Sequence, residues 1–179
     1  DRLRSRGLGD VYKRQAVICV LIVIVLALVL IGSLCTGGPK QVVKEYYQAI
    51  EKCDAKKLLD TVPKDYLKEV MDEKDLTKRE LLKEVQAYLD KYYSGYDDIK
   101  VSITDQEKLD RDDFSDYFDF DLEEDADLEI KKAVQFDLKV RYQSDEGKQT
   151  EKEEFIVFRY ENGWYSMDAV FLVAMSAYL

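Results

Sequence analysis

The sequence predicts an α+β domain that follows a transmembrane helix, with helices first and an antiparallel sheet after them. Three observations support this prediction. An uncharged apolar run fills residues 16–34, apolar residues recur at helical spacing over residues 39–93, and the spacing changes to two from residue 99 onward. We expect the helices to pack on one face of the sheet and to form a single core.

The apolar run at residues 16–34 is long enough for a membrane-spanning helix. Its 19 residues would extend roughly 28 Å at a rise of about 1.5 Å per residue, close to the ~30 Å thickness of the hydrocarbon layer. The basic residues that precede it predict a cytoplasmic N-terminus. Two alternatives remain open, a cleaved signal sequence and a lipoprotein lipidated at Cys35, although Leu34 and Gly32 fit a lipidation motif poorly.

The segment before the run differs from the rest of the chain. Residues 1–15 resemble translated adapter sequence, and the chain begins with Asp1 instead of methionine, which indicates a piece of a longer protein. If the flanking arginines are not native, the predicted orientation loses support. The expected organisation is therefore an N-terminal segment (1–15), a transmembrane helix (16–34), a linker (35–38) and one α+β domain (39–179).

The helices of the domain are predicted from periodicity and from capping residues. Asp54 is placed to cap a short second helix, and Pro63 ends it. Thr77 and Glu80 have the spacing of a capping box, which opens the longest helix. The expected helices are residues 39–52, 55–61 and 78–93, with another turn or two at 65–71.

The strands follow from alternation and from one turn signal. Apolar and polar residues alternate at 99–103 and at 134–143, and the next strand, 149–161, is apolar on both faces near its end. Asn162 and Gly163 predict a type I′ hairpin turn, which leads into a last strand at 164–168. The apolar residues 169–179 fit either a continued strand or a packed tail.

Composition excludes several classes of function. The chain has no histidine, which rules out histidine-based catalytic triads and metal sites with histidine ligands. Its formal net charge is −10, and this acidity makes nucleic acid an improbable partner. With so many acids, no catalytic pair stands out. We therefore assign no catalytic residue and no cofactor, and lean against an enzyme.

Residues 105–129 form the most acidic segment of the chain. Within it Asp119, Asp121 and Glu123 have an alternating spacing that weakly suggests calcium binding. They lack the central glycine and the terminal glutamate of a calcium loop. Aromatic residues interleave with the acids, so we expect a solvated surface or a short amphipathic helix at the edge of the sheet.

The second candidate site is aromatic. The chain has 13 Tyr, 7 Phe and 1 Trp, and several of them fall where a helix and a sheet would face each other. An apolar cavity with polar side-chain tips could hold a small ligand there, although ordinary core packing accounts for the same residues. The candidate pocket residues are Tyr46, Tyr47, Phe136, Phe158, Trp164 and Tyr165.

Two short motifs resemble a known family. The segment from Pro39 to Leu59 is similar to the opening helices of bacterial domains with the nuclear transport factor 2-like (cystatin-like) fold, with Cys53 where glycine is usual. Asn162-Gly163-Trp164-Tyr165 resembles the closing hairpin of the same fold, especially in membrane-anchored or lipoprotein members. The resemblance implies a helix-wrapped, strongly bent sheet that forms a cone with a pocket.

We expect a non-catalytic, membrane-anchored extracytoplasmic module with a binding or accessory role in the cell envelope, its partner a cell-envelope protein or peptide. One alternative is a cone-fold domain that binds a small ligand or acts as an enzyme. Another is a sensor whose cytoplasmic N-terminal part is missing. A polar pocket with a buried acid would favour the small-ligand alternative, and a filled core would favour the protein-binding module.

Overall fold

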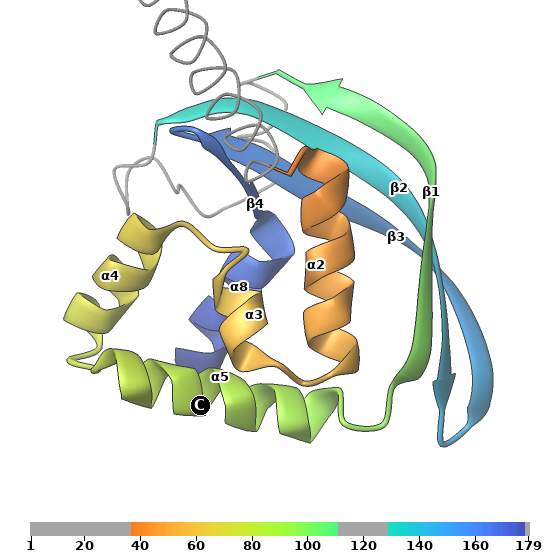
Figure 1. The fold of residues 1–179 in the computed structure, drawn as a ribbon, viewed down its shortest axis with the longest axis horizontal. Helices are drawn as coiled ribbons and strands as arrows, with labels where there is room; N and C mark the ends of the chain where they lie inside the picture. The colour runs from red at the N-terminus through yellow and green to blue at the C-terminus, as the bar shows by residue number, and fades with distance from the viewer. Residues whose placement is uncertain (1–36, 111–128, 178–179) are drawn as a thin grey trace, which may run out of the picture. The chain divides into compact units, whose positions relative to one another are not determined.

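The computed structural model describes residues 37–110 and 129–177, all but the first of which belong to one compact unit, Gly38–Leu179. Four helices come first, an antiparallel sheet follows, and a helix closes the described chain (Figure 1). The predicted α+β class is therefore confirmed. The predicted span 16–34 and Cys35 lie outside the described residues. Within the described residues, no helix is long and apolar enough to cross a membrane.

The N-terminal helices agree with the periodicity of the sequence. Their buried residues recur every three or four positions, as in Val43, Tyr47 and Ile50. The segment 65–71, expected to form a turn or two, is a full helix that runs from residue 64 to residue 73. The helices are α2 (Pro39–Glu51), α3 (Ala55–Leu59), α4 (Lys64–Glu73) and α5 (Lys78–Tyr92).

The predicted capping residues form hydrogen bonds at the helix ends. The Asp54 carboxylate accepts a hydrogen bond from the Lys57 amide at 3.1 Å. The Thr77 amide donates to the Glu80 carboxylate at 2.8 Å, and the Glu80 amide donates to the Thr77 hydroxyl at 3.3 Å. These bonds satisfy amides that have no partner inside the helix, and so they fix where α3 and α5 begin.

In the described part of the chain, the sheet has four antiparallel strands in the order β1-β2-β3-β4. Strands β1 to β3 are long and curve around the side that carries α2 (Figure 1). Residues 105–109, expected to belong to an acidic surface or helix, are the end of β1. Asp119, Asp121 and Glu123 lie outside the described residues. The strands are β1 (Asp97–Leu109), β2 (Ile130–Ser144), β3 (Gly147–Tyr160) and β4 (Gly163–Ser166).

The predicted hairpin exists, but its turn lies one residue earlier than expected. Tyr160 pairs with Gly163, so Glu161 and Asn162 are the turn residues, and Glu161 takes the positive φ of 49°. Gly163 is instead a paired strand residue under the Tyr165 ring. A Cβ atom at Gly163 would lie 2.6 Å from the Tyr165 hydroxyl oxygen. Close approach of the ring, and not turn geometry, therefore accounts for this glycine.

The C-terminal prediction was wrong in its boundary. The last strand ends at Ser166, and residues expected as a strand continuation or a packed tail form helix α8 (Met167–Ala177). The Ser166 hydroxyl accepts a hydrogen bond from the Ala169 amide at 3.1 Å and so caps the new helix. The helix is apolar on most sides because it packs against α5, α3 and β3.

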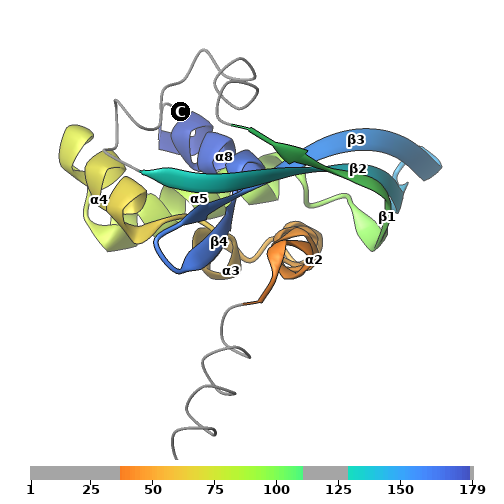
Figure 2. The same ribbon diagram turned by 90° about the horizontal axis from the view of Figure 1, so that it is seen from above.

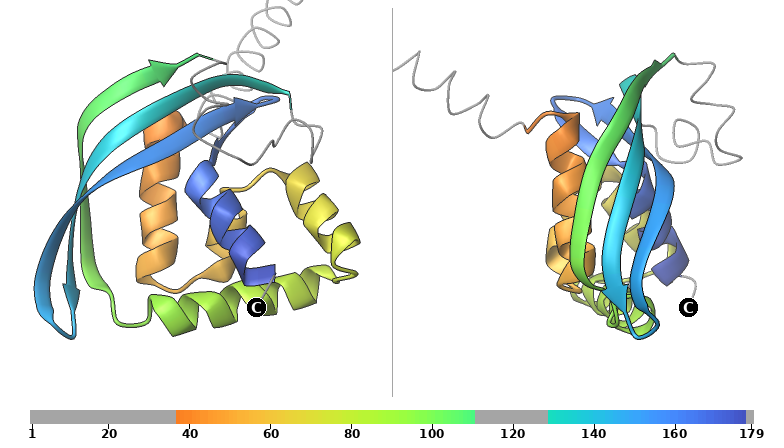
Figure 3. Two further views of the ribbon diagram at one scale, coloured as in Figure 1. Left: turned by 180° about the vertical axis from the view of Figure 1, so that it is seen from behind. Right: turned by 90° about the vertical axis from the view of Figure 1, so that its right-hand side faces the viewer.

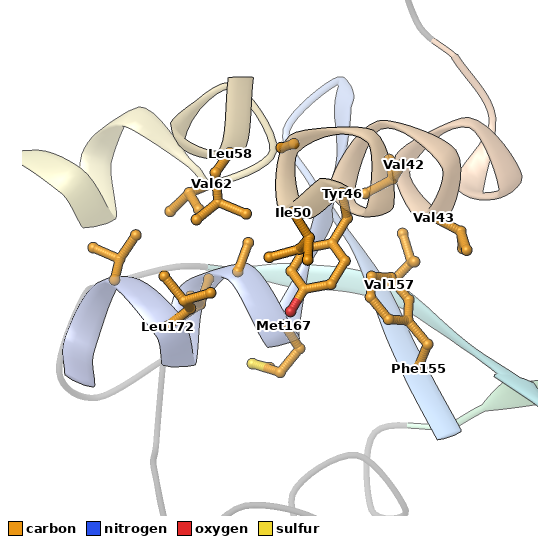
Figure 4. Packing of buried hydrophobic residues seen from close by; sticks show 14 of the residues in the cluster. Val42, Val43, Tyr46, Ile50, Leu58, Val62, Phe155, Val157, Met167 and Leu172 are labelled. Atoms are coloured by element: carbon orange, nitrogen blue, oxygen red, sulfur yellow. The ribbon is translucent and has the colours of Figure 1, made fainter. Parts of the chain in front are cut away.

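The core continues on both faces of β3, so the expectation that the helices pack on one face of the sheet is wrong. Phe155 and Val157 face α2, whereas Ile156 and Phe158 are buried on the other face. Figures 2 and 3 show α2 and α8 on different sides of the sheet, which agrees with this two-sided burial. Figure 4 shows the part of the core where α2, β3 and α8 meet, with Tyr46 directed toward the start of α8.

Candidate functional site

A cavity of about 240 Å³ lies between α2, the segment that joins α5 to β1, the sheet and the first turn of α8. It is slightly smaller than the sites of drug-sized ligands, which measure about 300–1,000 Å³. Tyrosines and carboxylates dominate its wall. The lining residues are Tyr46, Tyr47, Ile50, Tyr93, Tyr96, Ile99, Val140, Tyr142, Glu151, Glu153 and Asp168.

The alternation of side chains along β3 places two glutamates in the wall of the cavity. Residues on one face of a strand are two positions apart, so Glu151 and Glu153 lie on the same face as Phe155 and Val157. Across the ladder Glu151 pairs with Val140. The face that packs on α2 is therefore apolar at one end of β3 and carries two carboxylates at the other, where the cavity opens.

Two groups of tyrosine rings line the cavity. On α2, Tyr46 and Tyr47 meet edge to face with ring centroids 5.2 Å apart, and Tyr46 also packs on Phe155 at 5.0 Å. On the other side, Tyr96 lies 5.7 Å from Tyr93 and 4.7 Å from Tyr142. Because each ring is held by neighbouring rings, we expect the wall to be ordered before any ligand binds.

Hydrogen bonds connect the tyrosines to the carboxylates of β3. The Tyr47 hydroxyl donates to Glu153 at 2.6 Å, and the Tyr142 hydroxyl donates to Glu151 at 2.5 Å. Burial, followed by the hydrogen bond to Glu153, raises the pKa of Tyr47 well above its ordinary value. Burial and the negative charge of Asp168 do the same to the pKa of Tyr46. Both phenols are therefore protonated and uncharged at physiological pH.

Asp168 is the buried acid of the cavity. Its pKa is raised from 3.8 to about 7, mainly by burial and further by the charge of Glu153, whereas the backbone N–H groups of Asp168 and Ile156 lower it. The bond from Ile156 also gives Asp168 a structural role, because β4 pairs with β3 only as far as Val157. Asp168 thus satisfies an amide at the sheet edge while its side chain borders the cavity.

The structure brings together only part of the predicted aromatic site. Tyr46 and Tyr47 line the cavity. Phe136 and Phe158 are fully buried in the core at 0% exposure. Trp164 and Tyr165 are half-buried on β4 and do not line the cavity.

Sequence reasoning missed the carboxylates of the site, although two signals were present. Glu151 and Glu153 lie four and two positions before the inward-facing Phe155. The alternation of faces along β3 therefore predicts that both glutamates also face inward. Asp168 is the one acid in the apolar sequence of α8, where a charge requires a reason. Tyr93 and Tyr96 carried no signal, because only the folded turn brings them beside β2.

The described residues offer few other candidates. Among them, no group of three or more Cys, Asp or Glu residues converges to hold a metal ion. Cys53 is a half-buried free thiol whose sulfur lies 3.7 Å from the Leu89 carbonyl oxygen. Burial raises the pKa of this thiol, and so lowers its reactivity. The tyrosine-lined cavity is thus the site with the clearest chemistry.

No protein-family model, no curated protein and no solved structure matches this chain. The fold and the cavity, as the structure has them, define an α+β domain with a tyrosine- and carboxylate-lined pocket. Any function must follow from that chemistry.

Proposed function

We propose that the domain is a small-molecule-binding module whose ligand occupies the cavity between α2 and the sheet. The observation that carries this proposal is a space of about 240 Å³ whose wall combines five tyrosines with three carboxylates. A core filled by its own side chains would instead have favoured a module that binds a protein or peptide of the cell envelope. A concave site with a few polar groups directed into it is typical of ligand pockets.

The same proposal includes the nuclear transport factor 2-like fold. Three features support it: the N-terminal helices lie against a long curved sheet, the cavity is on the side of α2, and Trp164 and Tyr165 follow a tight hairpin. Cys53, which stands where the resembling family has glycine, adopts a φ of 44°, in the region that glycine favours. A pocket enclosed by helices and a bent sheet is what that fold would supply.

We further propose that the module is tethered to a membrane and lies outside the cytoplasm. The support is the uncharged run 16–34 and the basic residues before it. A tethered binding module would present its ligand, or report its presence, at the membrane surface. In that arrangement the net negative charge of the chain is repelled by anionic lipid headgroups.

A second candidate function is acid–base catalysis by Asp168, and one observation favours it. A pKa of about 7 lets a carboxyl group both accept and release a proton near neutral pH, which is the property of an efficient general acid–base catalyst. This candidate predicts that a bound compound is converted to product. Product signals that disappear in Asp168→Asn would support it, and an unchanged compound would leave binding as the function.

Filling the cavity should abolish binding. Val140 lines the cavity, and Val134 lies on the same face of β2 without lining it. Overpacking by phenylalanine costs about 1–3 kcal/mol of stability at either position, so the two variants are matched. The test is a ligand-observed NMR screen of small neutral, cationic and anionic compounds against the full chain. We expect the compounds that bind the wild-type chain to bind Val134→Phe as well, but not to bind Val140→Phe.

Two outcomes of this screen would contradict the proposed function. Melting temperatures establish first that both variants fold. If no compound binds the wild-type chain, or if Val140→Phe binds as well as wild type, the cavity is not a ligand site and the proposed function fails.

A further inference from the structure

The chemistry of the cavity indicates the charge of its ligand. Glu151, Glu153 and Asp168 contribute three carboxylates, and no lysine or arginine among the described residues lines the cavity. The ion pairs seen in the described part of the chain, Lys74 with Glu73 and Lys100 with Asp98, do not involve the lining. Within the described residues, the carboxylates of the cavity therefore have no cationic partner among its lining.

Hydrogen bonds do not neutralise the negative charge of these carboxylates. The phenols of Tyr47 and Tyr142 donate to Glu153 and Glu151, but they are neutral and remove no net charge. Glu153 and Asp168 line the same cavity, and the charge of Glu153 adds to the effect of burial in raising the pKa of Asp168. Two interacting carboxylates without a counter-charge favour a cation as the occupant.

The tyrosines favour the same kind of ligand. The face of an aromatic ring attracts a cation within about 6 Å, most strongly where water is excluded. Five rings line this cavity, and edge-to-face contacts such as those of Tyr46 with Tyr47 and of Tyr96 with Tyr142 turn neighbouring rings in different directions. Rings in several orientations can surround a rounded group such as an alkylated ammonium.

The cavity suits an organic cation better than a metal ion. In the described chain the acids do not converge closely enough to coordinate a metal. The space of about 240 Å³ is much larger than a bare ion needs. An ammonium with alkyl groups would place its charge toward Glu153 and Asp168 and its carbon atoms against the rings.

We propose that the cavity binds a small organic ammonium, held by the carboxylates of Glu153 and Asp168 and enclosed by tyrosine rings. This inference rests on the proposed small-molecule function. The charge provides selectivity over neutral compounds of the same shape. The rings provide selectivity over strongly hydrated inorganic cations.

The test compares matched pairs of probes by titration calorimetry on the full chain. Choline is paired with 3,3-dimethylbutan-1-ol, which has the same shape without the charge, and cyclohexylamine is paired with cyclohexanol. We expect the cation of at least one pair to bind about tenfold or more tightly than its neutral partner. Equal affinities within both pairs, or no binding of either cation, would overturn the proposal.

Two neighbouring glutamates on β3 supply the matched variants. Glu153 faces the cavity, whereas Glu154 is exposed and points to the opposite face. We expect Glu153→Gln to reduce the preference for the cation to about threefold or less while affinity for the neutral partner is retained, and Glu154→Gln to keep the full preference. An equal loss in both variants would mean that surface charge attracts the probes, which contradicts a cation site in the cavity.

The design separates the two proposals. If neutral probes bind as tightly as cations and Val140→Phe abolishes both, the pocket stands and the cation proposal fails. If Val140→Phe changes no affinity, the pocket itself is wrong.

Discussion

Phe136→Ala is expected to lower the free energy of unfolding by about 3 to 5 kcal/mol, which is the usual cost of truncating a buried phenylalanine. Phe136 has 0% exposure and lies on the α2 side of β2. Its ring fills space that the surrounding side chains cannot close by small movements. Urea or thermal denaturation of the full chain measures the change.

Trp164 supplies the comparison for this prediction. Its ring is half-buried on the edge strand β4, so Trp164→Ala is expected to cost about 1 to 2 kcal/mol, below the value for a fully buried tryptophan. A larger loss for Trp164→Ala than for Phe136→Ala would contradict this assignment of core and edge. Neither residue lines the cavity, so the folded fraction of each variant should bind small compounds as wild type does.

Asp168→Asn is expected to stabilise the domain at pH 8 by roughly 2 kcal/mol. The pKa of Asp168 is about 7 in the folded chain, against an ordinary value of 3.8. One pKa unit corresponds to about 1.4 kcal/mol, which sets an upper limit near 4 kcal/mol. Contact of the side chain with the cavity reduces that figure. Asparagine keeps an oxygen that can accept the Ile156 amide, so the structural bond can survive.

The sign of the pH dependence follows from proton binding. Between pH about 4 and 7 the folded state holds a proton on Asp168 that the unfolded state has lost, so stability falls as pH rises through this window. Asp168→Asn should remove this part of the slope and differ little from wild type at pH 4. Asp137→Asn, at an exposed position on β2, is the control. A variant that is less stable than wild type at pH 8 would show that the charge of Asp168 is compensated.

The helices and the central strands could be predicted because their signals are local. The spacing of Val43, Tyr47 and Ile50 and the capping box of Thr77 and Glu80 depend only on nearby residues, and both are present in the structure. The alternation in β2 predicted its buried face for the same reason. Phe136 and Leu138, which were inward in that pattern, have exposures of 0% and 1%.

The boundary between β4 and α8 could not be predicted from local signals. Residues 167–177 are apolar on most sides, so neither a period of two nor one of 3.6 stands out. The structure resolves the ambiguity through the Ser166 cap and through packing on α5 and β3, which are distant in sequence.

The candidate site was predictable only on its α2 side. Tyr46 and Tyr47 were identified because a helix that packs on a sheet must point its aromatic residues inward. Tyr93, Glu153 and Asp168 come from three other elements, and their meeting depends on the register of β3 and on where α8 begins. An acid in a strand also looks exposed until the strand's partner and its curvature are known.

The central claim is that small molecules bind in the cavity between α2 and the sheet, and tyrosine-ring NMR of the full chain tests it most directly. On addition of the compounds that bind in the screen, we predict shifted ring signals for Tyr46, Tyr47 and Tyr93. Tyr160 serves as the reference, because its hydroxyl bonds to Asp65 at 2.8 Å and its ring does not line the cavity. Shifts confined to Tyr160, or to rings outside the cavity, would contradict the claim.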